Sequence, residues 1–271
     1  MIASGGGLLP RMLVGRRVAF ASGQGGTWAE YAVAPAMRCI PLRKTISLAQ
    51  GASLIVNPLT VVSFFDMIKR GRHAAIINNA AASALGRMII RLGQRSGVKV
   101  INIVGRQEQA DVLKALGAEY VLDSSDDRFA PSLRDLAHRL RATIAFDAVG
   151  GSQTHTIVEA VPPGSTVVVY AGLAGEPSVF NPRTLAGEDK RIVGVYLANW
   201  MARRGLVGML RDIWRVQTLI AAELQTTIRG RFPLSAAQTT LDSYRSNMTA
   251  GKVLLVADPE QAAIADEVRV E

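Results

Sequence analysis

The middle of the chain alternates short apolar runs with stretches in which apolar positions recur with a helical period. The apolar runs are predicted to be buried strands, and they lie at 74–78, 99–105, 119–123, 143–150, 165–172 and 191–198. The helical patterns lie between them, at 85–97, 108–117 and 131–142. Strands that alternate with short helices imply crossover connections. The pattern therefore predicts an α/β fold, a doubly wound parallel sheet with helices on both faces.

The two ends of the chain follow a different pattern. Residues 17–41 form short β-like pieces separated by Gly and Pro, and a strand is predicted at 251–258 after a helical stretch at 235–248. We expect the two ends to form together a partial all-β domain beside the α/β domain.

Composition excludes several classes of protein. Cys39 is the only cysteine, which rules out an internal disulfide and indicates a reducing, cytoplasmic compartment. The three histidines (His73, His138 and His155) and this cysteine show no metal-ligand spacing, so no zinc site is expected. The longest apolar region, 51–70, is broken by polar residues, and we expect neither a membrane span nor a secretory signal.

The net charge of +9 comes from lysines and arginines that are spread in ones and twos. A nucleic-acid-binding surface would gather such residues and interleave them with aromatic side chains. We therefore expect no nucleic-acid partner. A small polyanionic ligand, such as a dinucleotide or a CoA thioester, explains the basic charge equally well.

The segment "NNAAASALG", residues 78–86, joins a predicted strand to a predicted helix. The free N–H groups of such a helix start attract anions, and small side chains let a pyrophosphate approach the backbone. Ser83 adds a hydroxyl that suits a phosphate oxygen. Small residues also suit tight packing in a core, and the segment by itself leaves both interpretations open.

Arg106 ends the next predicted strand, twenty positions after Gly86. A residue at this place lies beside the adenosine ribose in dinucleotide-binding folds. A guanidinium suits the 2′-phosphate of NADPH, whereas an acidic residue suits the 2′-hydroxyl of NADH. The sequence favours NADPH. Glu108 keeps NADH open, and Arg106 as a solubilising surface residue is the alternative interpretation.

Several further segments add to these observations. They are "GTWAEYAV" (26–33), "VNPLTV" (56–61), "NAAASALG" (79–86), "LKALGAEYVLDSSD" (113–126), "FDAVGG" (146–151) and the long segment 167–200. In this order and spacing the chain resembles the medium-chain dehydrogenase/reductase superfamily, in its zinc-free quinone-reductase and 2-enoyl-thioester-reductase branches. Segment 167–200 is similar to the mitochondrial-type enoyl reductases.

The resemblance implies a Rossmann-type dinucleotide-binding domain at 51–226. It also implies a partial GroES-like β domain formed by 1–50 and by the C-terminal return, 227–271. In the family, a segment upstream of the matching part carries a tyrosine that acts as a general acid. We therefore expect Met1 to be an internal methionine of a longer ancestral protein. The implied activity is hydride transfer from NADPH to a conjugated enone, a quinone or an enoyl thioester.

The resemblance also assigns site residues. The phosphate turn falls on Ala82, Ser83, Ala84, Leu85 and Gly86, and the contact with the ribose phosphate falls on Arg106. The nicotinamide side falls on Thr60, Tyr170, Ala171, Gly172, Leu173, Val195, Tyr196 and Leu197, and Lys252 matches a basic position near the cofactor. The chain departs from the family where Ala84 and Ala171 replace glycines, and where Val195 and Tyr196 replace bulkier aromatics.

Reduction of a conjugated acceptor also needs a proton donor. Tyr196 is the first candidate, and Tyr170, Tyr31, Lys252 and Asn57 are the others; the alternative is that Tyr196 only packs against the cofactor. Asp147 either lies at the cofactor edge or bonds to its own turn, and His73 is interpreted as a surface or hinge residue.

Two other functions remain open. One is that of a zinc-type alcohol dehydrogenase, and the other is that of an NADPH-binding protein without catalysis. We further expect a homodimer, because 191–198 is predicted near an edge of the sheet and an unpaired edge invites a partner.

Overall fold

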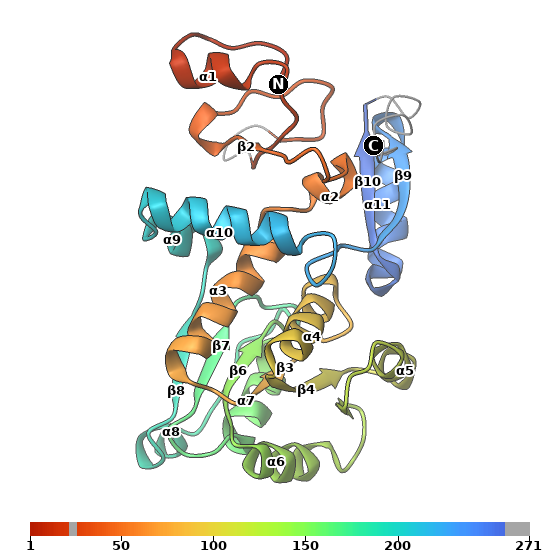
Figure 1. Cartoon of the computed structure of the whole chain (residues 1–271). Coiled ribbons are helices and arrows are strands. Elements are labelled where there is room, and N and C mark those ends of the chain that lie inside the picture. Colours follow the sequence, from red (N-terminus) through yellow and green to blue (C-terminus); the bar gives the residue numbers. More distant parts are fainter. Residues whose placement is uncertain (22–25, 258–271) are drawn as a thin grey trace. The chain divides into compact units, whose positions relative to one another are not determined.

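The computed structural model describes residues 1–21 and 26–257, and the chain forms two compact units (Figure 1). The first unit comprises Met1–Thr60 and the residues from Leu206 onward, and the second comprises Val61–Gly205. The last part of the expected C-terminal return, 258–271, lies outside the described residues.

The second unit is built on a parallel sheet. Its strands are β3 (Ala75–Asn78), β4 (Lys99–Val104), β5 (Tyr120–Asp123), β6 (Ala142–Asp147), β7 (Thr166–Val169) and β8 (Arg191–Gly194). They are ordered β5-β4-β3-β6-β7-β8, and every neighbouring pair is parallel. The chain moves outward from β3 in one direction and returns to β6 on its other side. In open parallel sheets of this kind, ligands bind at the carboxyl ends of the strands where the two directions separate.

Helices cover both faces of this sheet. They are α3 (Val56–Gly71), α4 (Ala84–Ser96), α5 (Gln107–Ala115), α6 (Phe129–Leu140), α7 (Gly151–Ala160) and α8 (Pro182–Gly187). The short helix α9 (Leu197–Ala202) follows β8 and buries no residue. Ala145 of β6 belongs to a buried cluster with Leu133 of α6 and Ile157 of α7. The next residue, Phe146, faces the other way and stacks on Phe64 of α3 with ring centroids 4.2 Å apart. The predicted doubly wound α/β fold is confirmed.

The first unit contains short elements. They are α1 (Leu8–Leu13), β1 (Val18–Ala19), η1 (Ala36–Arg38), β2 (Ile40–Pro41), α2 (Leu48–Ala52), α10 (Leu206–Leu219), β9 (Ile228–Pro233), η2 (Leu234–Ala236), α11 (Ala237–Ser246), η3 (Met248–Ala250) and β10 (Lys252–Val256). β1 pairs antiparallel with β2, and β9 pairs parallel with β10. The side chain of Gln50 donates to Thr226 O (2.9 Å) and accepts from Thr226 N (3.0 Å), so it joins the two ends of the chain.

Three strand predictions are wrong in extent. The strand expected at 143–150 ends at Asp147, and Gly150 is already the N-cap of α7. The strand expected at 191–198 ends at Gly194, and Leu197 already begins α9. Its partner β7 ends at Val169, and Val195 N donates to Val169 O as the last bond of the ladder. The strand expected at 165–172 ends at Val169; Tyr170 N still donates to Asp147 O (3.0 Å), and the chain turns after it.

The short β-like pieces expected within 17–41 are present as β1 and β2, but the expectation is wrong for the segment 26–33 inside this range. The structure assigns no strand to these residues, although all eight are described. Tyr31 and Val33 are largely exposed, so the apolar alternation of this segment is not used in a core.

No helix in the described part of the chain combines the length and the apolar character needed to cross a membrane.

Candidate functional site

The turn between β3 and α4 is the first part of the candidate site. Ser83 is the N-cap of α4, and its hydroxyl oxygen accepts from Gly86 N (3.0 Å). The N–H groups of Ala84 and Leu85 belong to the first turn of α4, where a helix supplies no acceptor of its own. The helix start is therefore an anion-attracting end whose cap is formed by Ser83.

Close backbone packing shapes this turn. A Cβ on Gly86 would lie 2.4 Å from Ala81 O and 2.7 Å from Ala81 C, so only glycine fits. Ala81 and Ala82 are buried in a cluster with Ile90 of α4. Ala80 has a φ of 45°, the left-handed conformation that L-residues rarely adopt. The turn thus serves core packing, and this packing is compatible with the other interpretation left open by the sequence.

Arg87 was missed by the sequence analysis. Its Nε donates to Ala82 O (3.0 Å) inside the turn, and burial lowers the pKa of its guanidinium from the usual value. Its position one residue after Gly86 is the only signal in the sequence.

Arg106 lies where the sequence predicts, at the end of β4. It is the N-cap of α5, in an extended conformation, and it is exposed. Because β4 lies next to β3 and is parallel to it, Arg106 and the turn at 79–86 lie at the same edge of the sheet. Glu108 follows in the first turn of α5.

Tyr170 begins the loop after β7 and packs edge to face on Phe64, with ring centroids 4.9 Å apart. Burial, and secondarily the charge of Asp147, raise the pKa of its phenol, so the hydroxyl stays protonated over the physiological range. Ala171 is half-buried, whereas Gly172 and Leu173 are exposed. Leu173 N donates to Ala148 O (3.0 Å), which ties this loop to the loop after β6.

Val195 and Tyr196 connect β8 to α9, which begins at Leu197, at the same edge of the sheet. Tyr196 is 69% exposed and is the N-cap of α9. The position of α9 is fixed by Arg204, whose Nη2 lies 2.6 Å from Asp66 Oδ2 of α3 and whose guanidinium lies over the Trp200 ring.

Thr60 and Lys252 belong to the first unit and are described within it. Thr60 is buried, and its hydroxyl donates to Val56 O (2.7 Å). The ammonium of Lys252 donates to the hydroxyl of Tyr244 (2.5 Å). Both side chains thus have local structural partners.

Asp147 is fully buried, and its carboxylate accepts from side-chain and backbone donors. Of the two interpretations of this residue, the bond to its own turn is correct, because Val149 N and Gly150 N both donate to Oδ1. The donor that follows β3, Asn79, was missed, since nothing in the sequence pairs residues so far apart.

His73 precedes β3 at the amino ends of the strands, away from the site. Its Nδ1 lies 2.7 Å from Thr143 Oγ1, and burial lowers the pKa of the ring below the usual 6.5. The interpretation as a surface residue is therefore only partly right: the ring is half-buried and bonded.

The folded state favours neutral His73, so the unfolded chain binds more protons just below pH 6.5. The contribution of neutral His73 to the free energy of unfolding is fully present above that pH. It is lost as the pH decreases from the pKa of the unfolded chain to the lower pKa of the folded protein. We expect the melting temperature, measured by thermal denaturation, to decrease less between pH 7 and pH 5 for His73→Gln than for the wild type. Replacing the exposed His155 by Gln is the control, and an equal acid sensitivity of all three proteins would contradict the prediction.

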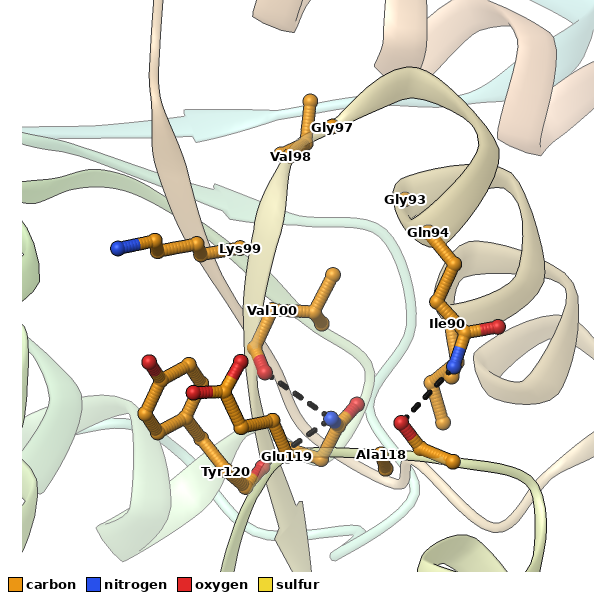
Figure 2. Close-up of a pocket in the computed structure, with 12 residues that line it drawn as sticks. Ile90, Gly93, Gln94, Gly97, Val98, Lys99, Val100, Ala118, Glu119 and Tyr120 are labelled. Carbon is orange, nitrogen blue, oxygen red and sulfur yellow. Dashed lines mark hydrogen bonds between the residues drawn. The ribbon is translucent and has the colours of Figure 1, made fainter.

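Figure 2 shows a pocket of about 230 Å³ between α4 and the beginnings of β4 and β5. Lys99 and Tyr120, which begin these strands, line it. Gln94 crosses from α4 and donates to Leu116 O (3.1 Å) and Gly117 O (3.0 Å). The pocket lies at the amino ends of the strands, so it is separate from the candidate site.

Within the described residues, no group of three or more His, Cys, Asp or Glu side chains is arranged to hold a metal ion.

Comparison with known proteins identifies relatives. Residues 84–212 match the family described as zinc-binding dehydrogenase. The chain is 30% identical to the mitochondrial enoyl-[acyl-carrier-protein] reductase of Homo sapiens over 239 residues, which cover 85% of this chain and 63% of the human protein. For the Rattus norvegicus enzyme the identity is 30%, over 65% of this chain and 48% of that protein. The chain therefore spans about half to two thirds of the length of these relatives.

Comparison with solved structures also identifies relatives. A Mesorhizobium loti protein assigned as an NADPH:quinone reductase superposes with a TM-score of 0.86 at 34% identity, covering 94% of this chain and 74% of that one. The quinone oxidoreductase of Escherichia coli, solved with NADPH, superposes with a TM-score of 0.78 at 19% identity, covering 90% of this chain and 76% of that one. The second likeness concerns the fold alone.

Proposed function

The chain belongs to the medium-chain dehydrogenase/reductase superfamily, in its zinc-free quinone-reductase and enoyl-thioester-reductase branch, and on this basis we propose that it is an NADPH-dependent reductase. The proposed acceptor is a conjugated enone, a quinone or an enoyl thioester. The names of the relatives support this range, since they include both quinone and enoyl reductases.

The β3–α4 turn is the observation that carries the proposal. It combines the free N–H groups at the start of α4 with a backbone approach that tolerates no Cβ at Gly86. The N–H groups suit an anionic pyrophosphate, and the close packing of Gly86 on Ala81 holds the start of the helix against the turn. Arg106, at the end of the neighbouring strand, supplies a cation for a 2′-phosphate.

The proposed roles follow from this edge of the sheet. Ala82 to Gly86 bind the pyrophosphate and Arg106 binds the ribose phosphate. Tyr170 to Leu173 and Val195 to Leu197 orient the nicotinamide side. Bound NADPH supplies the hydride. The residues of this chain are proposed to exclude water and to deliver the proton.

The test is a fluorescence titration with NADPH and with NADH, followed by NADPH oxidation in the presence of enones, quinones and enoyl thioesters. We expect tighter binding of NADPH and turnover with at least one acceptor class. If neither nucleotide binds at millimolar concentration, the proposal is refuted. Binding without turnover would favour a cofactor-binding protein without catalysis.

Among the acceptors, the net charge of +9 favours an anionic one, such as a thioester that carries phosphates. An oxidation rate that falls with salt for a CoA thioester, but not for a neutral quinone, would support this choice. A rate for the thioester that is insensitive to salt would contradict it.

Tyr196 is the proposed proton donor, because its phenol is exposed at the same edge as the turn. We expect Tyr196→Phe to lower kcat by about tenfold, since water replaces the phenol only in part, and to leave the Kd of NADPH unchanged. Tyr120→Phe removes a phenol at the opposite edge and is the control. Equal loss of both quantities, or no loss, would remove Tyr196 from this role.

We also propose that the protein is a cytoplasmic homodimer formed through β8, which lies at the edge of the sheet. A monomeric mass in solution would contradict the dimer.

A further inference from the structure

Two buried side chains connect the carboxyl ends of β3 and β6, the neighbouring strands at which the order of strands along the chain reverses. Asn79 follows β3 and Asp147 ends β6, and both are fully buried. Asn79 Nδ2 donates to Asp147 Oδ1 (2.5 Å), and Asn79 Oδ1 accepts from Ala148 N (2.7 Å). The side chain that begins the phosphate turn is thereby bonded to the start of a second loop.

Asp147 shapes that second loop. Its Oδ1 also accepts from Val149 N (2.8 Å) and Gly150 N (3.0 Å), and its Oδ2 accepts from Thr154 Oγ1 (2.6 Å). A buried carboxylate is costly unless donors surround it. Four donors meet this one, so the loop after β6 is wrapped around it in a single conformation.

The same bonds continue to the loop after β7. Leu173 N donates to Ala148 O (3.0 Å) and Ala174 N donates to Val149 O (2.8 Å). Ser178 Oγ donates to Thr154 Oγ1 (3.0 Å). Three loops at the carboxyl edge of the sheet are therefore connected through one pair of side chains.

We propose that Asn79 and Asp147 are positioning residues that hold the phosphate turn and the loop at 170–174 in register, so that the affinity for NADPH depends on this pair. The inference rests on the proposed function, which assigns the two ends of the cofactor to these loops. Because both side chains are fully buried, they act through the loops.

Three variants and a control separate positioning from stability. Asn79→Ala removes the link between the two strands and leaves the other three donors on Asp147. Asp147→Asn is conservative, because its carbonyl oxygen can accept from the same three donors as Oδ1 while the hydroxyl of Thr154 rotates to accept from the new amide. Thr154→Val keeps the side-chain shape and removes the bonds to Asp147 and to Ser178, while the two main-chain bonds between the second and third loops remain. The control is Lys190→Met, which removes a buried ammonium bonded to Val158 O and Glu188 just before β8 begins.

The readouts are the Kd of NADPH by fluorescence, well below the lowest melting temperature, and the melting temperature itself. We expect Asn79→Ala to weaken binding by about tenfold and Thr154→Val by about threefold, since each loses hydrogen bonds within the charged network. Asp147→Asn should stay within about twofold of the wild type, because its hydrogen bonds persist. Lys190→Met should melt at a lower temperature and bind NADPH normally.

Wild-type affinity in Asn79→Ala, or in Thr154→Val if Asn79→Ala does not fold, would overturn the inference while the proposed function stands. A loss of affinity in Lys190→Met as large as that in Asn79→Ala would also overturn it, because general destabilisation would then explain both. Failure of the wild type to bind NADPH would refute the proposed function itself, and this inference with it.

Discussion

Gly86→Ala is expected to abolish measurable NADPH binding, with a loss of more than about a hundredfold in affinity. The new Cβ would lie 2.4 Å from the carbonyl oxygen of Ala81 and 2.7 Å from its carbonyl carbon. These are main-chain atoms, so rotation of a side chain cannot relieve the overlap. Either the helix start or the turn must move, and the N–H groups that are proposed to hold the pyrophosphate move with it.

The experiment is a fluorescence titration of both proteins with NADPH, after circular dichroism has verified that the variant is folded. Gly187→Ala is the matched control, because a Cβ there meets no atom within 4 Å. A folded Gly86→Ala protein that binds NADPH as tightly as Gly187→Ala would show that the turn does not hold the cofactor.

Arg106→Asp is expected to reverse the cofactor preference. The guanidinium at the end of β4 is exposed and free to meet a 2′-phosphate, and the substituted carboxylate would repel that phosphate and accept from a 2′-hydroxyl instead. We expect the affinity for NADPH to fall by about a hundredfold, while the affinity for NADH is unchanged or increased.

Paired titrations with NADPH and NADH check this prediction. The control is Arg139→Asp, which makes the same charge change on an exposed arginine in the last turn of α6. An equal effect of the two substitutions on NADPH would mean that Arg106 contributes only to the general positive field of the protein.

Much of the α/β unit could be predicted from the sequence, because its central strands β3, β4 and β6 are buried on both faces and form continuous apolar runs. Ile76 and Ile77 of β3 are fully buried, and so are the neighbouring strand residues Ile101 and Phe146. The predicted strand ends were wrong where the end of a strand depends on pairing with its neighbour and not on amino-acid composition. Val195 and Tyr196 are as suitable for a strand as the residues before them, yet β7 has already turned away.

Part of the candidate site could also be predicted from the sequence, and part could not. The phosphate turn and Arg106 were predictable, because each is defined by residues that are local in sequence. The bond between Asn79 and Asp147 was not, because the two residues are 68 positions apart and meet only through the register of β3 with β6. The capping role of Ser83 was also missed, since a serine at a helix start suits a phosphate and a cap equally well.

The left-handed backbone at Ala80 has a thermodynamic consequence for ligand capture. It stores about 1 to 2 kcal/mol of strain that a glycine would avoid. A glycine-rich loop, however, samples many shapes when empty and loses that freedom when an anion docks. A turn made of alanine is already ordered before the ligand arrives, so we expect its entropic penalty for association to be smaller than that of a glycine-rich counterpart.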